Sequence, residues 1–197
     1  MKILSMKFAT TFLSALITFG FTWSKADSQI QTRENRQQTV SITVEKAPIK
    51  CNVEAYRAGF ASDEPKTSTL RTKPNKNSAI VKTITTKDEV VYSISGSDGK
   101  GWFEVSKIQA VSDVEETLFE GYGWIHSSQL DISIASSDAK LRAAPQKNSR
   151  VLKKLIPDES ESRPLTCKGK WMRIKSGRTI GWLSPEGQCA NPLTTCS

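Results

Sequence analysis

The chain has 197 residues, of which 37% are hydrophobic and 24% are charged, with 11 glycines and 8 prolines. This composition excludes collagen-like and polar low-complexity chains, and the length allows one or two domains. The formal net charge is +8.

Residues 1–26 have the features of a secretory signal peptide. Lys2 and Lys7 precede the uncharged stretch 8–23, and small residues stand three and one positions before a cut after Ala26. The uncharged stretch is shorter than the ~20 residues that span a bilayer, which favours cleavage over an uncleaved membrane anchor. We therefore predict a periplasmic or secreted protein without a membrane span after cleavage.

Residues 27–50 are polar and rich in glutamine, and they alternate weakly at 40–44. They predict a flexible leader with a possible short strand.

A self-match follows, in which residues 70–78 align with residues 141–149 at an offset of 71. Leu, Arg, Pro, Lys, Asn and Ser recur in register. Downstream, each copy has a Trp that opens a strand and a Gly-Trp-aliphatic segment that closes the copy: Trp102 and Trp171, then 123–125 and 181–183. The chain is therefore a duplication.

Short strands are predicted in both copies. Residues 90–94 are β-branched and aromatic, residues 102–107 alternate with the period of a half-buried strand, and glycines mark the turn at 96–101. No apolar stripe persists at helical spacing. We predict an all-β chain with two small units, 51–137 and 138–197.

Each copy resembles the bacterial Src-homology-3-like domain, a five-stranded, partly open barrel of exported wall-associated proteins. The Trp and Gly-Trp landmarks carry the resemblance, while Leu70-Arg71 and Leu141-Arg142 lack two residues of the family's Leu-x-Val-Arg pattern. The resemblance implies two small Src-homology-3-like β-barrels in tandem behind the signal peptide.

Residues 123–130 also resemble the eukaryotic Src-homology-3 domain. In that family, a Pro and a Tyr of this segment help to form the groove that binds polyproline helices. His126 and Gln129 occupy their places here, and copy two has Ser184 and Gln188. Eukaryotic-type binding of proline-rich peptides is therefore not expected.

The four cysteines, Cys51, Cys167, Cys189 and Cys196, predict disulfides, because an even number in an exported chain favours oxidation. Four cysteines allow three patterns of disulfide pairing. We favour Cys167–Cys189, within one barrel, with Cys51–Cys196 joining the two ends of the folded region. Cys189–Cys196 is the main alternative, because a short loop closes easily.

The sequence predicts no enzyme, cofactor or metal site. The single histidine, His126, lies in a strand-end motif rather than beside a nucleophile, and the cysteines lack the paired spacing of zinc ligands. The acidic pairs at 115–116 and 158–161 lie in polar stretches typical of solvated loops, and no phosphate-binding glycine motif occurs.

Charge differs sharply between the two copies. Residues 51–137 have 9 basic and 12 acidic residues, whereas residues 138–197 have 12 basic and 5 acidic residues, a net charge of +7. Copy two should therefore attract an anionic polymer, unless the charge is only a solvated surface or docks onto acidic copy one. The predicted ligand-binding residues are two aromatic and three basic side chains: Trp102, Trp171, Lys168, Lys170 and Arg173.

We thus predict a non-catalytic cell-envelope binding module that contacts peptidoglycan or another anionic wall component. The alternative is a periplasmic protein–protein interaction adaptor that binds a partner peptide. Nucleic acid is not expected as a partner, because it is mostly absent outside the cell.

Overall fold

The computed structural model describes residues 47–58, 64–111, 116–157 and 162–189, all within one compact unit spanning 44–197. The described residues form short strands and two 3-10 turns, and no α-helix occurs among them. The prediction of an all-β protein is confirmed. The predicted signal peptide and the possible strand at 40–44 lie outside the described residues.

Among the described residues, no helix has the length and apolar character needed to cross a membrane.

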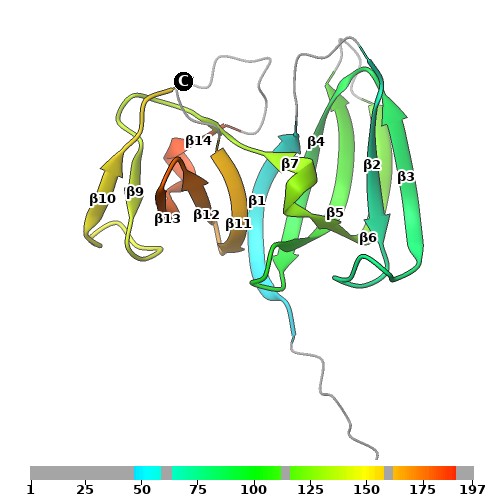
Figure 1. Ribbon diagram of the computed structural model, residues 1–197, viewed down its shortest axis with the longest axis horizontal. Helices are drawn as coiled ribbons and strands as arrows, with labels where there is room; N and C mark the ends of the chain where they lie inside the picture. The colour runs from blue at the N-terminus through cyan, green and yellow to red at the C-terminus, as the bar shows by residue number, and fades with distance from the viewer. Residues whose placement is uncertain (1–46, 59–63, 112–115, 158–161, 190–197) are drawn as a thin grey trace, which may run out of the picture. The chain divides into compact units, whose positions relative to one another are not determined.

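The first sheet has seven antiparallel strands in the order β3-β2-β6-β5-β4-β1-β7 (Figure 1). They are β1 (Ile49–Arg57), β2 (Lys66–Arg71), β3 (Ile80–Thr86), β4 (Glu89–Ser97), β5 (Trp102–Val111), β6 (Glu116–His126) and β7 (Leu130–Asp131). The 3-10 turn η1 (Ser127–Gln129) connects β6 to β7. β1 begins at Ile49, within the segment predicted as a flexible leader.

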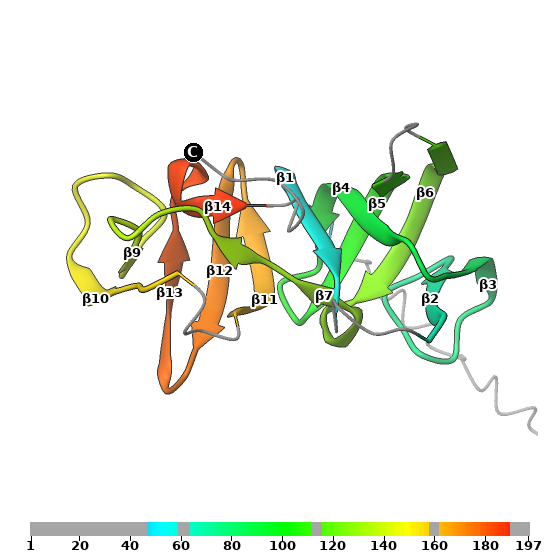
Figure 2. The ribbon, with the colours of Figure 1, turned by 90° about the horizontal axis from the view of Figure 1, so that it is seen from above.

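The second sheet has five antiparallel strands in the order β10-β9-β13-β12-β11 (Figure 2). They are β9 (Lys140–Arg142), β10 (Val151–Lys154), β11 (Ser162–Lys168), β12 (Trp171–Ser176) and β13 (Thr179–Leu183). The turn η2 (Pro185–Gly187) leads to β14 (Gln188–Cys189), which pairs with β8 (Ser133–Ile134). β8 precedes the predicted start of the second unit at 138, yet it pairs with that unit's last strand.

The core follows from the two-residue period of the strands. Phe103 and Val105 on β5 are fully buried, as are Met172 and Ile174 on β12, and the residues between them face outward. The buried side chains of both sheets form one hydrophobic cluster.

The repeated Leu-Arg…Ser motif builds the same loop twice. Arg71 Nη1 donates to the Ser78 carbonyl oxygen at 2.7 Å, and Arg142 Nη1 donates to that of Ser149 at 2.9 Å. Ser78 Oγ donates to the Lys73 carbonyl oxygen, and Ser149 Oγ donates to that of Ala144. The motif therefore recurs because these side chains satisfy the backbone of the loops at 72–78 and 143–149.

A buried arginine connects three backbone segments of the first sheet through hydrogen bonds. Arg57 is 3% exposed and donates to the carbonyl oxygens of Lys66, Thr86 and Asp88. The nearby carboxylate of Glu89 has a raised pKa because burial disfavours its charge more than the Arg57 guanidinium favours it.

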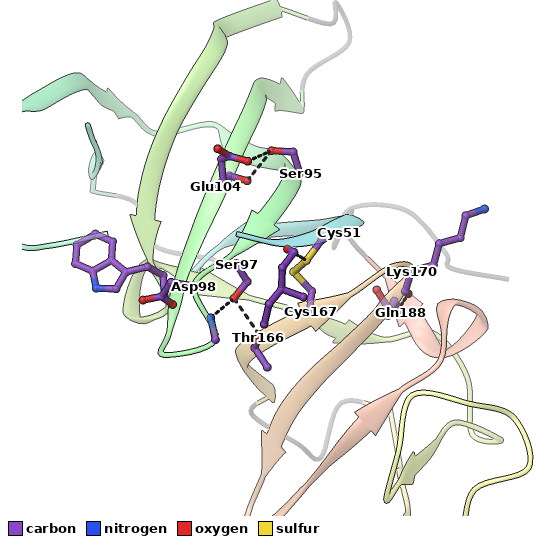
Figure 3. The surroundings of a disulfide bond; sticks show 12 residues. Cys51, Ser95, Ser97, Asp98, Glu104, Thr166, Cys167, Lys170 and Gln188 are labelled. Carbon is purple, nitrogen blue, oxygen red and sulfur yellow. Dashed lines mark hydrogen bonds between the residues drawn. A yellow bond between two sulfur atoms is a disulfide. The ribbon is translucent and has the colours of Figure 1, made fainter. Parts of the chain in front are cut away.

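A disulfide joins the two sheets, and it corrects the predicted pairing. Cys51 on β1 is bonded to Cys167 on β11, across 116 residues of sequence (Figure 3). The favoured pairs Cys167–Cys189 and Cys51–Cys196 are therefore wrong, because β1 of copy one lies beside β11 of copy two. Cys189 is also disulfide-bonded, and no described cysteine is free. The alternative pair Cys189–Cys196 involves Cys196, which lies outside the described residues.

We expect peptide mapping without reduction to recover Cys51 linked to Cys167. Replacing both by serine should lower the free energy of unfolding by about 2–5 kcal/mol, because the bond restricts a long loop of the unfolded chain. Chemical denaturation of the exported protein would measure this loss. A mapped peptide that links Cys167 to Cys189 would contradict the structure.

We expect Glu89→Gln to raise the melting temperature at pH 7. The folded-state pKa of Glu89 lies above its ordinary value of 4.5, so the folded protein holds this proton more tightly than the unfolded chain. Stability is therefore lost as pH rises from that value through the folded pKa, and the neutral amide avoids the loss. The gain should shrink as pH falls below about 4. Exposed Glu54→Gln on β1 is the control, and an equal gain there would refute the assignment.

Candidate functional site

Trp102 lies in a pocket on the first sheet. The pocket has a volume of about 490 Å³ and is lined by residues of the 72–78 loop region, the start of β5 and η1: Arg71, Asn75, Lys76, Trp102, His126, Ser128 and Gln129. Trp102 and His126 are opposite each other on β5 and β6, and their ring centroids are 5.1 Å apart in an edge-on arrangement. Two aromatic rings and two basic side chains therefore share one concave surface.

Local hydrogen bonds hold His126 in this position. Its Nδ1 accepts from the Ser128 backbone N–H at 3.2 Å and lies 2.8 Å from Ser128 Oγ, so the ring caps η1. The Ser127 N–H donates to the carbonyl oxygen of Gly101, which has a φ of 99°. That left-handed conformation favours glycine and turns the chain into Trp102.

The corresponding region of the second sheet is bridged by an ion pair. Alignment on the Gly-Trp segments places Ser184 where copy one has His126, and Glu186 where it has Ser128. Lys147 Nζ of the 143–149 loop lies 3.0 Å from Glu186 Oε1 of η2. Hydrogen bonds to its own backbone and to Lys147 lower the pKa of Glu186. The pair is exposed and adds little stability. It connects the loop and the turn that correspond to those lining the Trp102 pocket in copy one.

The second sheet brings together several of the predicted ligand-binding residues. Trp171 and Arg173 alternate with buried residues on β12 and point outward, as does Lys175. Lys168 is opposite Trp171 on β11. We call this the cationic face and define it by the outward basic and tryptophan residues of three adjacent strands: Arg163, Lys168, Trp171, Arg173, Lys175 and Trp182.

Cross-strand registers align the charges of the cationic face. Arg163 is opposite Lys175, and Arg173 is opposite Trp182, so their side chains leave the same side of the sheet. Arg163, Arg173 and Lys175 are exposed, and within the described part of the chain none of them has an acidic partner. Among the described residues, the face therefore presents positive charge without an ion-pair partner, beside a half-buried indole.

The first sheet has the corresponding row, with an acid in place of one of the two bases. There Trp124 is flanked by Arg71 and Glu104, whereas in the second sheet Trp182 is flanked by Arg142 and Arg173. Glu104 accepts a hydrogen bond from Ser95 Oγ at 2.9 Å (Figure 3). The duplicated scaffold is thus retained while one position changes from an acid to a base.

The remaining predicted residue, Lys170, lies apart from this face. It lines a shallow pocket with Asn52, Glu54, Pro185 and Gln188, and its carbonyl oxygen accepts from Gln188 Nε2 at 2.9 Å (Figure 3). The acidic Glu54 in that lining offsets the charge of Lys170.

Arg163 and Lys175 were not among the predicted ligand-binding residues, although Lys175 counts toward the basic charge predicted for copy two. The register on β11 shifts between Pro164 and Thr166, which obscures the alternation that would have placed Arg163 outward. Lys175 could have been found, because it continues the Trp171–Arg173 alternation.

Within the described ranges, no cluster of three or more His, Cys, Asp or Glu residues could hold a metal ion.

No protein-family model and no curated protein matches the chain. Among solved structures, NlpC2 from Trichomonas vaginalis is similar over 70% of this chain and 48% of its own, with 13% identity and a TM-score of 0.29. The chain spans about half the length of that protein, and a similarity of this size carries no argument about function.

Proposed function

We propose that this protein is a non-catalytic binding protein of the cell envelope, built from two Src-homology-3-like units, that contacts peptidoglycan or another anionic wall polymer. The observation that carries the proposal is the cationic face, where Arg163, Arg173 and Lys175 align in register with no ion-pair partner among the residues that the structure describes.

Electrostatics and shape both support an extended anionic ligand. Charges of one sign on a sheet surface attract an oppositely charged polymer, and a flat row of strands can contact several repeating groups at once. Half-buried Trp171 and Trp182 add indole surface on which a sugar ring or peptide group can stack. Charge would supply attraction, and stacking would supply contact that survives added salt.

The disulfides support the proposed location. Cys51–Cys167 is a structural bond between two sheets, and such bonds persist in oxidising compartments outside the cytosol. The predicted signal peptide at 1–26 would export the chain to such a compartment.

The test is binding of the full-length mature protein to purified peptidoglycan sacculi. Neutralising the face with Arg163→Gln, Arg173→Gln and Lys175→Gln together should weaken binding about tenfold or more at low salt. Binding by the unchanged protein should fall as salt rises, because the Debye length shrinks from about 10 Å at 0.1 M to about 3 Å at 1 M.

A matched triple variant separates the face from overall charge. Lys82, Lys87 and Lys100 are exposed on the first sheet, and replacing all three by Gln removes the same net charge. We expect this variant to bind nearly as well as the unchanged protein. Equal losses in the two variants would show that net charge, not the cationic face, drives retention.

The Trp102 pocket favours a second candidate function, an adaptor that binds a partner peptide. Its concave mixture of Trp102, His126, Arg71 and Lys76 suits an extended peptide with an acidic group. The two functions use different sheets and can be tested separately.

For the adaptor, we expect Trp102→Ala to abolish capture of envelope proteins from extract while leaving sacculus binding intact. Tyr122→Ala is the control, because Tyr122 is a 74% exposed aromatic residue on β6 outside the pocket. A thermal melt must first show that both variants are folded. Capture unaffected by Trp102→Ala would exclude the pocket as the peptide site.

A further inference from the structure

A further concave surface lies where the two sheets meet. We call it the junction pocket: it has a volume of about 720 Å³ and is lined by Ile49, Lys50, Ala144, Pro145, Gln146, Lys168 and Gly169. The residues come from β1 of the first sheet and from two loops of the second, so neither copy forms the pocket alone.

The disulfide and two hydrogen bonds fix the walls of the junction pocket. Ile49 and Lys50 directly precede Cys51, and Lys168 and Gly169 directly follow Cys167. The Asn52 N–H donates to the Gly169 carbonyl oxygen at 2.8 Å, and the Gly169 N–H donates to that of Lys50 at 2.9 Å. The two lysines are therefore held on adjoining segments by covalent and backbone bonds.

Hydrogen bonds also hold the third wall of the junction pocket. Ala144, Pro145 and Gln146 belong to the 143–149 loop, which is held by Arg142 and Ser149 through the repeated hydrogen bonds. Gly169 has a φ of 57°, and a Cβ added there would meet nothing within 4 Å, so the turn leaves open space toward the pocket.

The chemistry of the lining is that of an anion site with an apolar flank. Lys50 and Lys168 are exposed and are the charged residues of the lining; no acidic residue of the described chain belongs to it. Ile49, Ala144 and Pro145 supply apolar surface, and the Gln146 amide can both donate and accept.

The neighbouring pocket on the first sheet shows the contrast. It is lined by Ala47, Pro48, the loop residues 72–74, Asp98 and Trp124, with a volume of about 300 Å³. Its proline-containing loop corresponds to the 143–149 loop, but an acid lies at the turn where the second sheet has Lys168. The paired cations are a property of the junction pocket rather than of the repeated scaffold.

We propose that the junction pocket binds the free carboxylate end of a short peptide with a small apolar side chain. The ammonium groups of Lys50 and Lys168 would both donate to the carboxylate, Ile49 and Pro145 would contact the side chain, and Gln146 would pair with the preceding peptide group. The proposal rests on the proposed function only for its choice of ligand, a peptide of the kind found in the cell wall. The site requires the Cys51–Cys167 bond, because that bond joins its two charged walls.

The experiment titrates the isotope-labelled, oxidised mature protein with an acetylated tripeptide that ends in alanine, and with its carboxamide. The carboxylate peptide should shift the Gly169 amide signal, and the carboxamide should bind at least tenfold more weakly. Lys50→Gln and Lys168→Gln should each weaken the carboxylate peptide at least fivefold, whereas Lys100→Gln, at the corresponding turn of the first sheet, should not.

Three outcomes would overturn the proposal: equal binding of the two peptides, no effect of the two lysine variants, or displacement of the peptide by inorganic phosphate at lower concentrations than by acetate. Opening the disulfide with Cys51→Ser should abolish peptide binding. Sacculus retention is also measured on Lys50→Gln, which changes the junction pocket and no residue of the cationic face, so failure of this site and failure of the proposed function are distinguishable.

Discussion

The clamp between β1 and the β11–β12 turn is the constraint on which the rest of the structure depends. The Cys51–Cys167 bond is flanked by reciprocal backbone hydrogen bonds between Asn52, Gly169 and Lys50, and by a 2.9 Å hydrogen bond between the buried hydroxyls of Ser97 and Thr166. Each sheet alone is small and buries a limited core. The clamp makes them one unit, with a continuous cluster of buried side chains.

The two copies retain the side chains that hydrogen-bond to their backbone and differ in side chains that face outward. The Arg and Ser of the repeated motif satisfy carbonyl oxygens inside each loop, so their loss would remove the hydrogen bonds that hold these partly exposed loops in either copy. The outward position beside the Gly-Trp strand takes no part in the loop hydrogen bonds: it is Glu104, which accepts from Ser95 Oγ, in one copy and exposed Arg173 in the other. The two copies therefore share their loops and differ in charge at this position.

The repeat, the strands and the basic character of copy two were predictable, because alternation, glycine turns and charge are local properties of sequence. The disulfide pairing was not, since it depends on β1 of copy one lying beside β11, across 116 residues. The junction pocket was missed for the same reason: Lys50 precedes the repeat, and nothing local links it to Lys168. Arg163 was hidden by the register shift at Pro164.

Under the proposed function, the cationic face and the junction pocket suit different parts of one kind of ligand. A wall polymer offers repeated anionic groups, sugar rings and peptide ends, and a unit that presents charge, indole and a two-lysine pocket can engage them together. Because the clamp fixes the two sheets, contacts made by both copies need no further ordering of one against the other, which lowers the entropic cost of binding. Once one site holds the ligand, the effective concentration of the ligand at the other site is high, so weak contacts together give a higher overall affinity. This requires that the ligand spans the distance between the sites. Under the proposed function, the disulfide would therefore contribute to binding through the geometry it imposes as well as to stability.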